Sequence, residues 1–245
     1  IGYLLKAVNP SSRKIPVFAV GGHDTASAVA AVPNINDRSI HISSGTWSIV
    51  GIEVKEPIIN ETTYRLNFSN EGKVDRNIRL EKNVMGLWIF NELHRQFNEE
   101  GKNYSFEKMV ELAKAAKPYG SVFDPDIELF YSTGNVIEKI KKYCIETGQN
   151  VPKNDGEFIR CVLESLALKY RYVIEQFKNL TVNNLQSINI VGGGANNYLL
   201  NQFTADYTSM AVYAGPTEAT ALGNAMVQLN ALGCFRDKNE RRNLI

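Results

Sequence analysis

The final part of the chain alternates short apolar runs with helical patterns, and this alternation constrains the fold more than any other feature. Residues 185–191 predict a strand, residues 192–194 a glycine turn, and the residues up to Tyr207 a helix. A second strand at 211–214 and a helix from Glu218 follow. Because strands and helices alternate, the sequence predicts an α/β domain.

Length and composition exclude several classes of protein. The chain has 245 residues, and its 44% hydrophobic content is enough for one large core. A formal net charge of +1 provides no field that would attract a polyanion, so we expect no nucleic-acid partner. No apolar run approaches the roughly 20 residues that a membrane-spanning helix requires. We therefore expect a soluble, cytoplasmic protein that does not contact a membrane.

The rest of the sequence predicts strands first and helices afterwards. Residues 15–20 form a β-branched and aromatic run that suits a buried strand, followed by a small-residue helix at 25–31. Further strands are expected at 39–43, 47–52, 64–70 and 73–80, the first two joined by a tight turn at 44–46. Helices are expected at 84–97, 105–115 with Ser105 as N-cap, 135–147 before Gly148, and 155–178.

The cysteines favour no metal site. Cys144, Cys161 and Cys234 lie far apart, and none belongs to the paired spacing of a zinc ligand set. Buried free thiols are the simplest interpretation. Cys144 and Cys161 fall on consecutive predicted helices and could come close in space, so whether they form a disulfide stays open.

A first glycine turn, at residues 21–25, sets a carboxylate between a strand and a helix. Asp24 could accept a proton from a substrate hydroxyl, since its small neighbours leave room for a substrate. Asp is also a favoured N-cap, and from these residues alone capping is the stronger interpretation. His23 has the same ambiguity, because a lone histidine is more often a structural hydrogen-bonding group than a catalyst.

Two further glycine turns could hold a ligand. The turn at 43–47 offers hydroxyls and backbone N–H groups suited to an anion, although many hairpins with such turns bind nothing. The turn at 190–197 follows a strand as a dinucleotide fingerprint does, but Asn197 stands where the third glycine belongs. It could lie against a flat group such as an adenine ring, or it could serve only a close strand-to-helix crossing.

Taken in order, these segments resemble the carboxy-terminal half of the FGGY carbohydrate kinases. The resemblance is carried by GGHDTASAV, ISSGTWSIVGIE, NVMGLWIF, and NIVGGGANNYLLNQFTAD with AGPTEATALGNAMVQ. It implies an actin-like, ribonuclease-H-like ATPase fold with a mixed sheet flanked by helices, here a carboxy-terminal kinase domain over residues 1–245. It also implies a small-molecule sugar, ATP and Mg²⁺ as ligands, and the amino-terminal kinase domain of the same enzyme as partner.

The same resemblance assigns roles to residues around the first turn. Asp24 matches the catalytic base that takes the proton from a sugar hydroxyl as that oxygen attacks the γ-phosphoryl group. His23 and Thr25 match flanking positions that help to hold the sugar. Asn83 matches another sugar-contacting position.

Three more residues match nucleotide positions of the family. Thr46 corresponds to the second phosphate loop and Gly193 to the adenosine motif. Asn91 falls where the family has a nucleotide-contacting Gln, so its shorter side chain is a departure from the pattern.

Within the family, the His-Asp-Thr triplet and the Ser-Gly-Thr-Trp turn are most similar to the branch that phosphorylates L-rhamnulose at C1. A kinase for another ketose or polyol, or a non-catalytic nucleotide-binding module, are the alternatives. Because the amino-terminal domain of the family normally supplies the first phosphate loop, we expect this chain alone to be inactive.

Overall fold

A computed structural model describes residues 2–9, 11, 13–33, 35–74, 77–182, 184–236 and 240, and its centre is a six-stranded sheet. The strand order is β5-β6-β4-β3-β7-β8, with β3 antiparallel to β4 and parallel to β7. This arrangement confirms the predicted mixed sheet. The strands are β3 (Ser39–Ser44), β4 (Trp47–Val54), β5 (Ser69–Gly72), β6 (Ile78–Met85), β7 (Ser187–Val191) and β8 (Ala211–Ala214).

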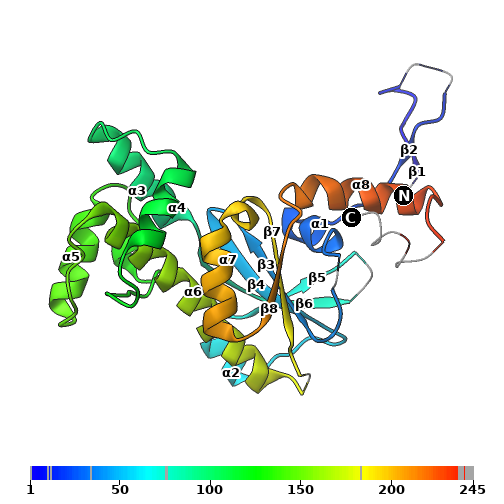
Figure 1. Cartoon of the computed structure of the whole chain (residues 1–245). Helices are drawn as coiled ribbons and strands as arrows, with labels where there is room; N and C mark the ends of the chain where they lie inside the picture. Colours follow the sequence, from blue (N-terminus) through cyan, green and yellow to red (C-terminus); the bar gives the residue numbers. More distant parts are fainter. Residues whose placement is uncertain are drawn as a thin grey trace.

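Helices cover both faces of the sheet, and a helical lobe lies beside it (Figure 1). One face carries α6 (Asp155–Leu180) and α7 (Tyr198–Thr208). The other face carries α1 (Asp24–Ala30) and α8 (Ala219–Ala231), which pack on each other. The lobe contains α3 (Trp88–Glu99), α4 (Phe106–Ala115), the short helix η1 (Glu128–Phe130) and α5 (Val136–Glu146).

Alternation along the strands separates an apolar face from a polar one. Ile40, Ile42 and Val50 point into the large core under α6, which extends without interruption into the lobe. The opposite face holds buried polar side chains, which need partners to be tolerated there. Its smaller apolar cluster joins Val29 of α1 to Val191 of β7. Each face of the sheet is therefore packed against a layer of helices.

Three buried polar side chains of this second face meet at one carboxylate, which reaches a histidine across β4. Glu81 Oε1 lies 2.9 Å from His41 Nε2 and accepts a hydrogen bond from Arg79 at 2.7 Å. The strand between His41 and Glu81 carries Gly51, where a Cβ would lie 2.5 Å from His41 Nε2 and 2.7 Å from Glu81 Cγ. Glycine at this position is what allows the two side chains to meet over the middle strand.

The predicted buried strand at 15–20 is wrong. Only Pro16–Val17 form a strand, β2, and it pairs with β1 (Gly2–Tyr3) in a separate two-stranded sheet. Both strands are exposed, and the pair projects from the body of the molecule (Figure 1). The apolar side chains of this run therefore belong to neither hydrophobic core of the described part of the chain.

Three other boundaries are also wrong, each for a local reason. The segment predicted as a strand at 64–70 begins in the helix α2 (Glu61–Arg65), because Asn60 and Thr63 form a capping box there. The segment predicted at 73–80 becomes strand only from Ile78, and residues 75–76 lie outside the described residues. The helix predicted from Val84 begins at Trp88, because Val84 continues β6 opposite Ser48.

The predicted hairpin turn and two predicted helix ends are confirmed. The hairpin of β3 and β4 turns at Gly45-Thr46, Ser105 accepts a hydrogen bond from the Lys108 N–H, and Gly148 follows α5 in the left-handed region.

The cysteines are free thiols, and two of the three are buried as expected. Cys144 and Cys161 are buried, and burial raises the pKa of Cys161 to about 12. For Cys234 the expectation of burial is wrong, because this residue is exposed.

Among the described residues, no helix combines the length and apolar character needed to cross a bilayer.

One carboxylate fastens α3 to the segment ahead of α5. Glu92 Oε2 accepts hydrogen bonds from the Gly134 N–H at 2.8 Å and from Arg95 at 3.0 Å. The hydrogen bond from Arg95 is the main cause that holds the pKa of Glu92 below its usual value. Its side chain is only 9% exposed, so the ionised form is bound in a poorly solvated place. A carboxylate with a lowered pKa stabilises the fold above its unfolded-state pKa.

We expect Glu92→Gln to lower the unfolding free energy at pH 7 by about 1–2 kcal/mol, because a charge-assisted pair is lost. The gap in melting temperature between this variant and the parent should shrink as pH falls from about 4.5 through the lowered pKa, where the parent also loses the charge. Thermal unfolding followed by circular dichroism between pH 7 and 3 measures both. The control is Glu99→Gln, which removes an exposed partner of Arg95; an equal loss there would contradict the assignment.

Candidate functional site

A cavity of about 490 Å³ lies between the helical lobe and the ends of β3 and β7. It brings together three predicted nucleotide residues: Thr46 from the hairpin turn, Asn91 from α3 and Gly193 from the triple-glycine turn. These residues are far apart in the sequence. Its lining consists of Gly45, Thr46, Leu87, Phe90, Asn91, Phe106, Glu107, Val110, Gly193, Gly194, Asn196, Asn197 and Tyr198.

The hairpin turn is fixed from the side of α3. The Leu87 N–H donates to the Gly45 carbonyl at 2.8 Å, and the Gly86 N–H donates to the Thr46 carbonyl at 3.1 Å. A Cβ on Gly86 would lie 2.6 Å from the Gly45 carbonyl oxygen, so this contact requires glycine. The carbonyls of the turn are thus occupied, and its conformation is set by the start of α3.

The triple-glycine turn crosses the hairpin at the shortest approach in the site. A Cβ on Gly194 would lie 1.9 Å from Ser44 Oγ, and one on Gly192 would lie 2.9 Å from the Ser44 carbonyl oxygen. Gly192 also has φ of 84°, which side chains rarely adopt. Gly193 differs, because it is exposed and a Cβ added there would meet no atom within 4 Å. Two glycines therefore make the crossing, and the middle one faces the cavity.

Each turn has a backbone donor without a hydrogen-bond partner among the described residues. The backbone N–H groups of Thr46 and Gly193 donate no hydrogen bond within the part of the chain that the structure describes. The N–H of Gly193 begins the short helix η2 (Gly193–Asn196), where the first donors of a helix are normally unsatisfied. Such a pair of donors on glycine turns can receive an anion.

The opposite wall is apolar and aromatic. Phe90 of α3 and Phe106 of α4 stack with ring centroids 5.8 Å apart and planes inclined by 23°, and Val110 lies one turn after Phe106. Together with the triple-glycine turn, these side chains line the cavity. Sequence reasoning missed Phe106 and Val110, because their helical spacing is that of ordinary core positions. Asn91 on the same wall brings a short amide.

Asn197 has a different role from the glycine whose place it takes in a dinucleotide fingerprint. It precedes α7 as the N-cap, and its side-chain oxygen accepts a hydrogen bond from the Leu200 N–H at 3.0 Å. Its neighbour Asn196 accepts a hydrogen bond from Thr217 at 3.1 Å, which ties the turn to the segment before α8. Asn197 thus starts the helix that a glycine would leave uncapped.

A buried tyrosine supports the hairpin from below. The hydroxyls of Tyr170 on α6 and Ser48 on β4 are 2.6 Å apart, and both side chains are fully buried. Burial raises the pKa of Tyr170 to about 12, so its proton stays in place for this hydrogen bond. Ser48 pairs with Ser44, the residue that the glycine turn crosses. The strand segment beneath the crossing is therefore hydrogen-bonded to α6.

Asp24 lies at the start of α1 and is accessible, with 74% of its side chain exposed. It is the first helical residue, and the residue that caps the helix is His23. The Thr25 N–H donates to Asp24 Oδ1 at 2.8 Å and approaches His23 Nδ1 at 3.3 Å. The interpretation of Asp24 as the N-cap is therefore wrong, although its carboxylate does bind a backbone N–H of the first turn. Asp24 and His23 do not line the cavity described above.

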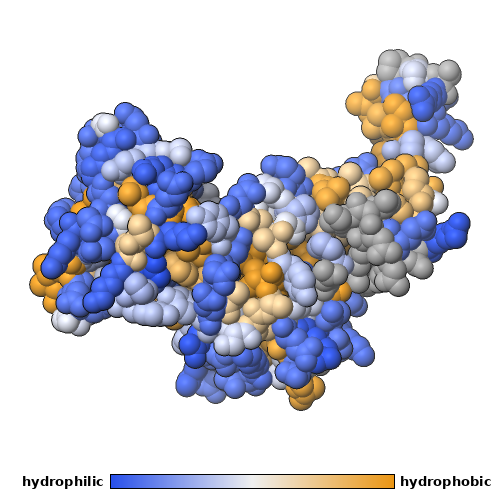
Figure 2. Space-filling model, viewed as in Figure 1, coloured by the Kyte–Doolittle hydropathy of each residue, from blue (hydrophilic) through white to orange (hydrophobic). Residues whose placement is uncertain are grey.

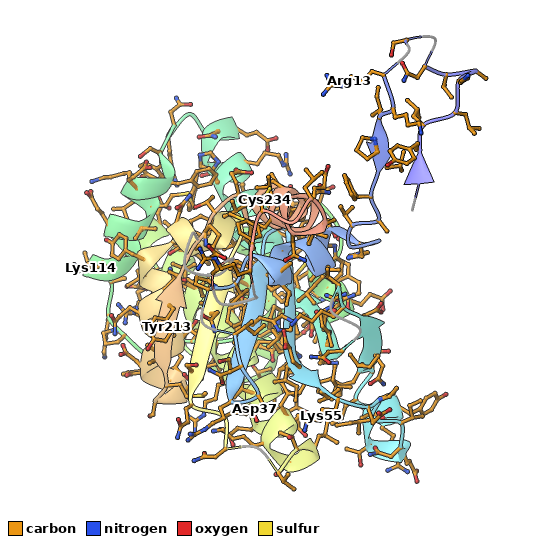
Figure 3. The ribbon with its side chains drawn as sticks, turned by 90° about the vertical axis from the view of Figure 1, so that its right-hand side faces the viewer. Arg13, Asp37, Lys55, Lys114, Tyr213 and Cys234 are labelled. Atoms are coloured by element: carbon orange, nitrogen blue, oxygen red, sulfur yellow. The ribbon has the colours of Figure 1, made fainter. Side chains whose placement is uncertain are left out.

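The predicted sugar residues share one end of one sheet face with Asp24. Asn83 is exposed on β6 and lies in a cross-strand row with Ser43 and Val191, the last of which packs against α1. After α1 the chain runs to Asp37, which lies just before the first residue of β3 (Figure 3). The start of α1 therefore lies toward the other end of that strand, where β3 ends. Thr25 is buried, and its backbone N–H donates a hydrogen bond to the Asp24 side chain.

Elsewhere in the molecule, a second cavity of about 360 Å³ lies between α6 and the segments around residues 117–121 and 150–153. It contains none of the predicted site residues. Its buried carboxylate, Glu164, is already bound by Arg160 at 2.7 Å and by the Tyr119 N–H at 3.2 Å. In the described ranges, no three His, Cys, Asp or Glu side chains form a group that could hold a metal ion.

Comparison with curated proteins finds relatives of about twice the length. A rhamnulokinase from Bacteroides thetaiotaomicron is 42% identical over 231 residues, covering 94% of this chain and 47% of that protein. A rhamnulokinase from Bacillus subtilis is 39% identical over 229 residues, with coverage of 94% and 47%. The chain therefore spans about half the length of the curated relatives it matches.

Solved structures agree on the fold. A xylulose kinase from Rhodospirillum rubrum superposes with a TM-score of 0.70 at 16% identity, over 97% of this chain and 47% of that one. A glycerol kinase from Plasmodium falciparum, solved with ADP, gives a TM-score of 0.65 at 12% identity, over 90% and 44%. This likeness confirms the predicted actin-like ATPase fold.

A sequence model of the FGGY family of carbohydrate kinases, C-terminal domain, matches residues 40–232. This match covers well over half of the chain, and the relatives near 40% identity span almost all of it. The chain therefore belongs to the FGGY family of carbohydrate kinases and contains the C-terminal domain of that family.

Proposed function

We propose that this chain is the carboxy-terminal half of a kinase that transfers the γ-phosphoryl group of ATP to the C1 hydroxyl of L-rhamnulose. The observation that supports nucleotide binding best is the cavity at the two glycine turns, where Thr46 and Gly193 present free N–H groups opposite Phe90 and Phe106. The choice of sugar is supported by relatives that carry the name rhamnulokinase.

In this proposal the cavity holds the nucleotide. The adenine ring lies between Gly193 and the aromatic wall, since a ring can approach backbone closely where no side chain intervenes. The phosphates lie along the hairpin turn, where the Thr46 N–H and hydroxyl donate to their oxygens. Phosphoryl transfer depends mostly on such positioning and on electrostatic stabilisation, so donors without bulk suit the task.

Asp24 completes the reaction from the start of α1. Its carboxylate accepts the proton of the C1 hydroxyl while that oxygen forms a bond to the γ-phosphorus and the bond to the ADP oxygen breaks. His23 and Asn83, both exposed at the same end of the sheet, hold the sugar in line. A bound Mg²⁺ ion would neutralise phosphate charge, and it would be held by phosphate oxygens and water together with one or two carboxylates.

If the cavity binds nucleotide, the 245-residue chain should bind ATP on its own but fail to phosphorylate L-rhamnulose. At ATP concentrations about 100 times Kd, binding should add about 2.7 kcal/mol to stability and raise the melting temperature by about 5–10 °C. Thermal unfolding with and without Mg-ATP tests the first part, and a coupled ADP-release assay tests the second. An unchanged melting temperature at millimolar ATP would contradict the nucleotide site, and sugar-dependent ADP release would contradict the need for a second domain.

Gly194→Ala should damage both the fold and the cavity, because its new methyl group would collide with Ser44. We expect a loss of about 1–3 kcal/mol in unfolding free energy, the usual cost of overpacking, and weaker ATP binding by at least about tenfold. Gly193→Ala is the matched control for stability, since nothing lies near its Cβ position. Calorimetric titration measures the ATP affinity of both variants, and thermal unfolding measures their stability. Equal melting temperatures for the two variants would show that the crossing does not constrain the turn.

Asp24→Asn should separate chemistry from binding in a two-domain protein. A suitable one joins the other half of the Bacteroides thetaiotaomicron relative to this chain, which is 42% identical to the half it replaces. We expect phosphoryl transfer to fall at least about 100-fold, the lower range for removing a general base, with ATP affinity retained. Asp37→Asn, on the loop at the opposite end of β3 (Figure 3), is the control and should leave the rate unchanged. Turnover by Asp24→Asn at the parent rate would remove Asp24 from the mechanism.

Assays of the same two-domain protein test which sugar is the substrate. Side-by-side assays with L-rhamnulose, xylulose and glycerol should give turnover with L-rhamnulose at the highest kcat/KM. Preference for another ketose or a polyol would keep the kinase assignment and replace the substrate.

A further inference from the structure

The second cavity, of about 360 Å³, lies where the start of α6 meets residues 117–121 and 150–153. It shares no lining residue with the cavity at the two glycine turns. The helix α6 packs against α4 of the helical lobe, and hydrophilic residues dominate the face of this lobe that Figure 2 shows. A cavity of this size can enclose a small metabolite. The charged residues of its lining are Lys117, Lys153, Glu157, Arg160 and Glu164.

Both carboxylates of this lining are already engaged by donors of the protein. Glu164 is almost fully buried, and it accepts hydrogen bonds from Arg160 Nε at 2.7 Å and from the Tyr119 N–H at 3.2 Å. Glu157 Oε2 accepts a hydrogen bond from the Lys153 N–H at 2.7 Å. The other oxygen of Glu157 is bound by the side-chain amide of the residue that caps α6. The negative charges of the lining therefore hold its walls together.

The cations of the lining, in contrast, keep donors that no described residue uses. Arg160 Nη1 donates to the carbonyls of Ala113 and Ala116 at 3.3 and 3.2 Å, whereas Nη2 makes no hydrogen bond to a described residue. The ammonium groups of Lys117 and Lys153 form neither an ion pair nor a hydrogen bond within the described ranges. Positive charge is therefore what the cavity offers to a ligand.

The guanidinium of Arg160 is fixed in orientation by its surroundings. Its side chain is only 12% exposed, and its guanidinium carbon lies 4.8 Å from the centre of the Phe203 ring of α7. A planar group held in this way loses little freedom when its remaining N–H groups bind an anion. On the same wall, the backbone N–H groups of Gly120 and Ser121 donate no hydrogen bond to a described residue.

We propose that this cavity is a second ligand site, which binds a phosphate monoester of about the size of a sugar phosphate. The phosphate group binds Arg160 Nη2 and the ammonium groups of Lys117 and Lys153. Arg and Lys are the side chains that bind phosphate, and free backbone N–H groups in a loop add to such sites. A phosphate monoester carries a charge of about −1.5 to −2 near neutral pH, which suits a lining with three cations and two engaged carboxylates.

Calorimetric titration of the 245-residue chain with glucose 6-phosphate tests the site. We expect binding of this ester, weaker binding of inorganic phosphate, and none of glucose. The double variant Lys117→Gln/Lys153→Gln should bind the ester at least about tenfold more weakly, because two charge-assisted contacts are lost. Both lysines are exposed and unpaired among the described residues, so the variant should keep the melting temperature of the parent.

The matched control is Lys6→Gln/Lys55→Gln, which removes the same charge from two exposed lysines outside the lining. It should leave the affinity for glucose 6-phosphate unchanged. Equal weakening in both double variants would show an effect of net charge alone and overturn the proposal. Failure of both glucose 6-phosphate and inorganic phosphate to bind at millimolar concentration, or equal binding of glucose, would also overturn it.

Amide chemical shifts measured by nuclear magnetic resonance locate the phosphate without using activity. The signals of Gly120 and Ser121 should move during titration with glucose 6-phosphate, while those of Thr46 and Gly193 stay in place. Movement at Thr46 and Gly193 alone would assign the phosphate to the other cavity and overturn the proposal. Each result has the same meaning whether or not the chain is part of an L-rhamnulose kinase, because the two cavities share no lining residue.

Discussion

The crossing of the triple-glycine turn over the hairpin turn is the constraint on which the site depends. Gly194 and Gly192 approach Ser44 so closely that no side chain fits at either position. Ser44 is fixed through its pairing with Ser48, which the buried Tyr170 hydroxyl holds from below. The two donor-bearing turns are therefore set relative to each other by the core, so the proposed nucleotide would need to order little of the protein.

The sheet face opposite α6 holds buried polar side chains and also carries α1. Glu81 is contacted by His41 across Gly51 and by Arg79 on its own strand, so these buried charged groups have partners on this face. The small side chains of α1 then pack closely against Val191 and Ala219. The start of α1 reaches the end of the sheet at which both glycine turns lie. The proposed base and the two glycine turns thus lie at the same end of one sheet.

The sequence predicted the parts of the site whose chemistry is local and missed those that only the tertiary structure defines. The turns at Gly45 and Gly193 follow from glycine after a strand, and they do meet in one cavity. Phe106 could not be found in this way, because a cavity wall and a core face have the same helical spacing. Likewise, Val84 continues a strand only because β4 lies beside it, whereas its own spacing suits a helix.

The wrong strand at 15–20 differs from these errors in its cause. The helix at Glu61 overrode a strand pattern because a capping box satisfies its first turn within the chain. At 15–20 no competing local structure replaces the strand, and the backbone of residues 18–20 is left without hydrogen bonds to the described residues. A strand needs a neighbouring strand to pair with, and residues 18–20 have none among the described residues. The apolar pattern was therefore necessary for a strand here and was not sufficient.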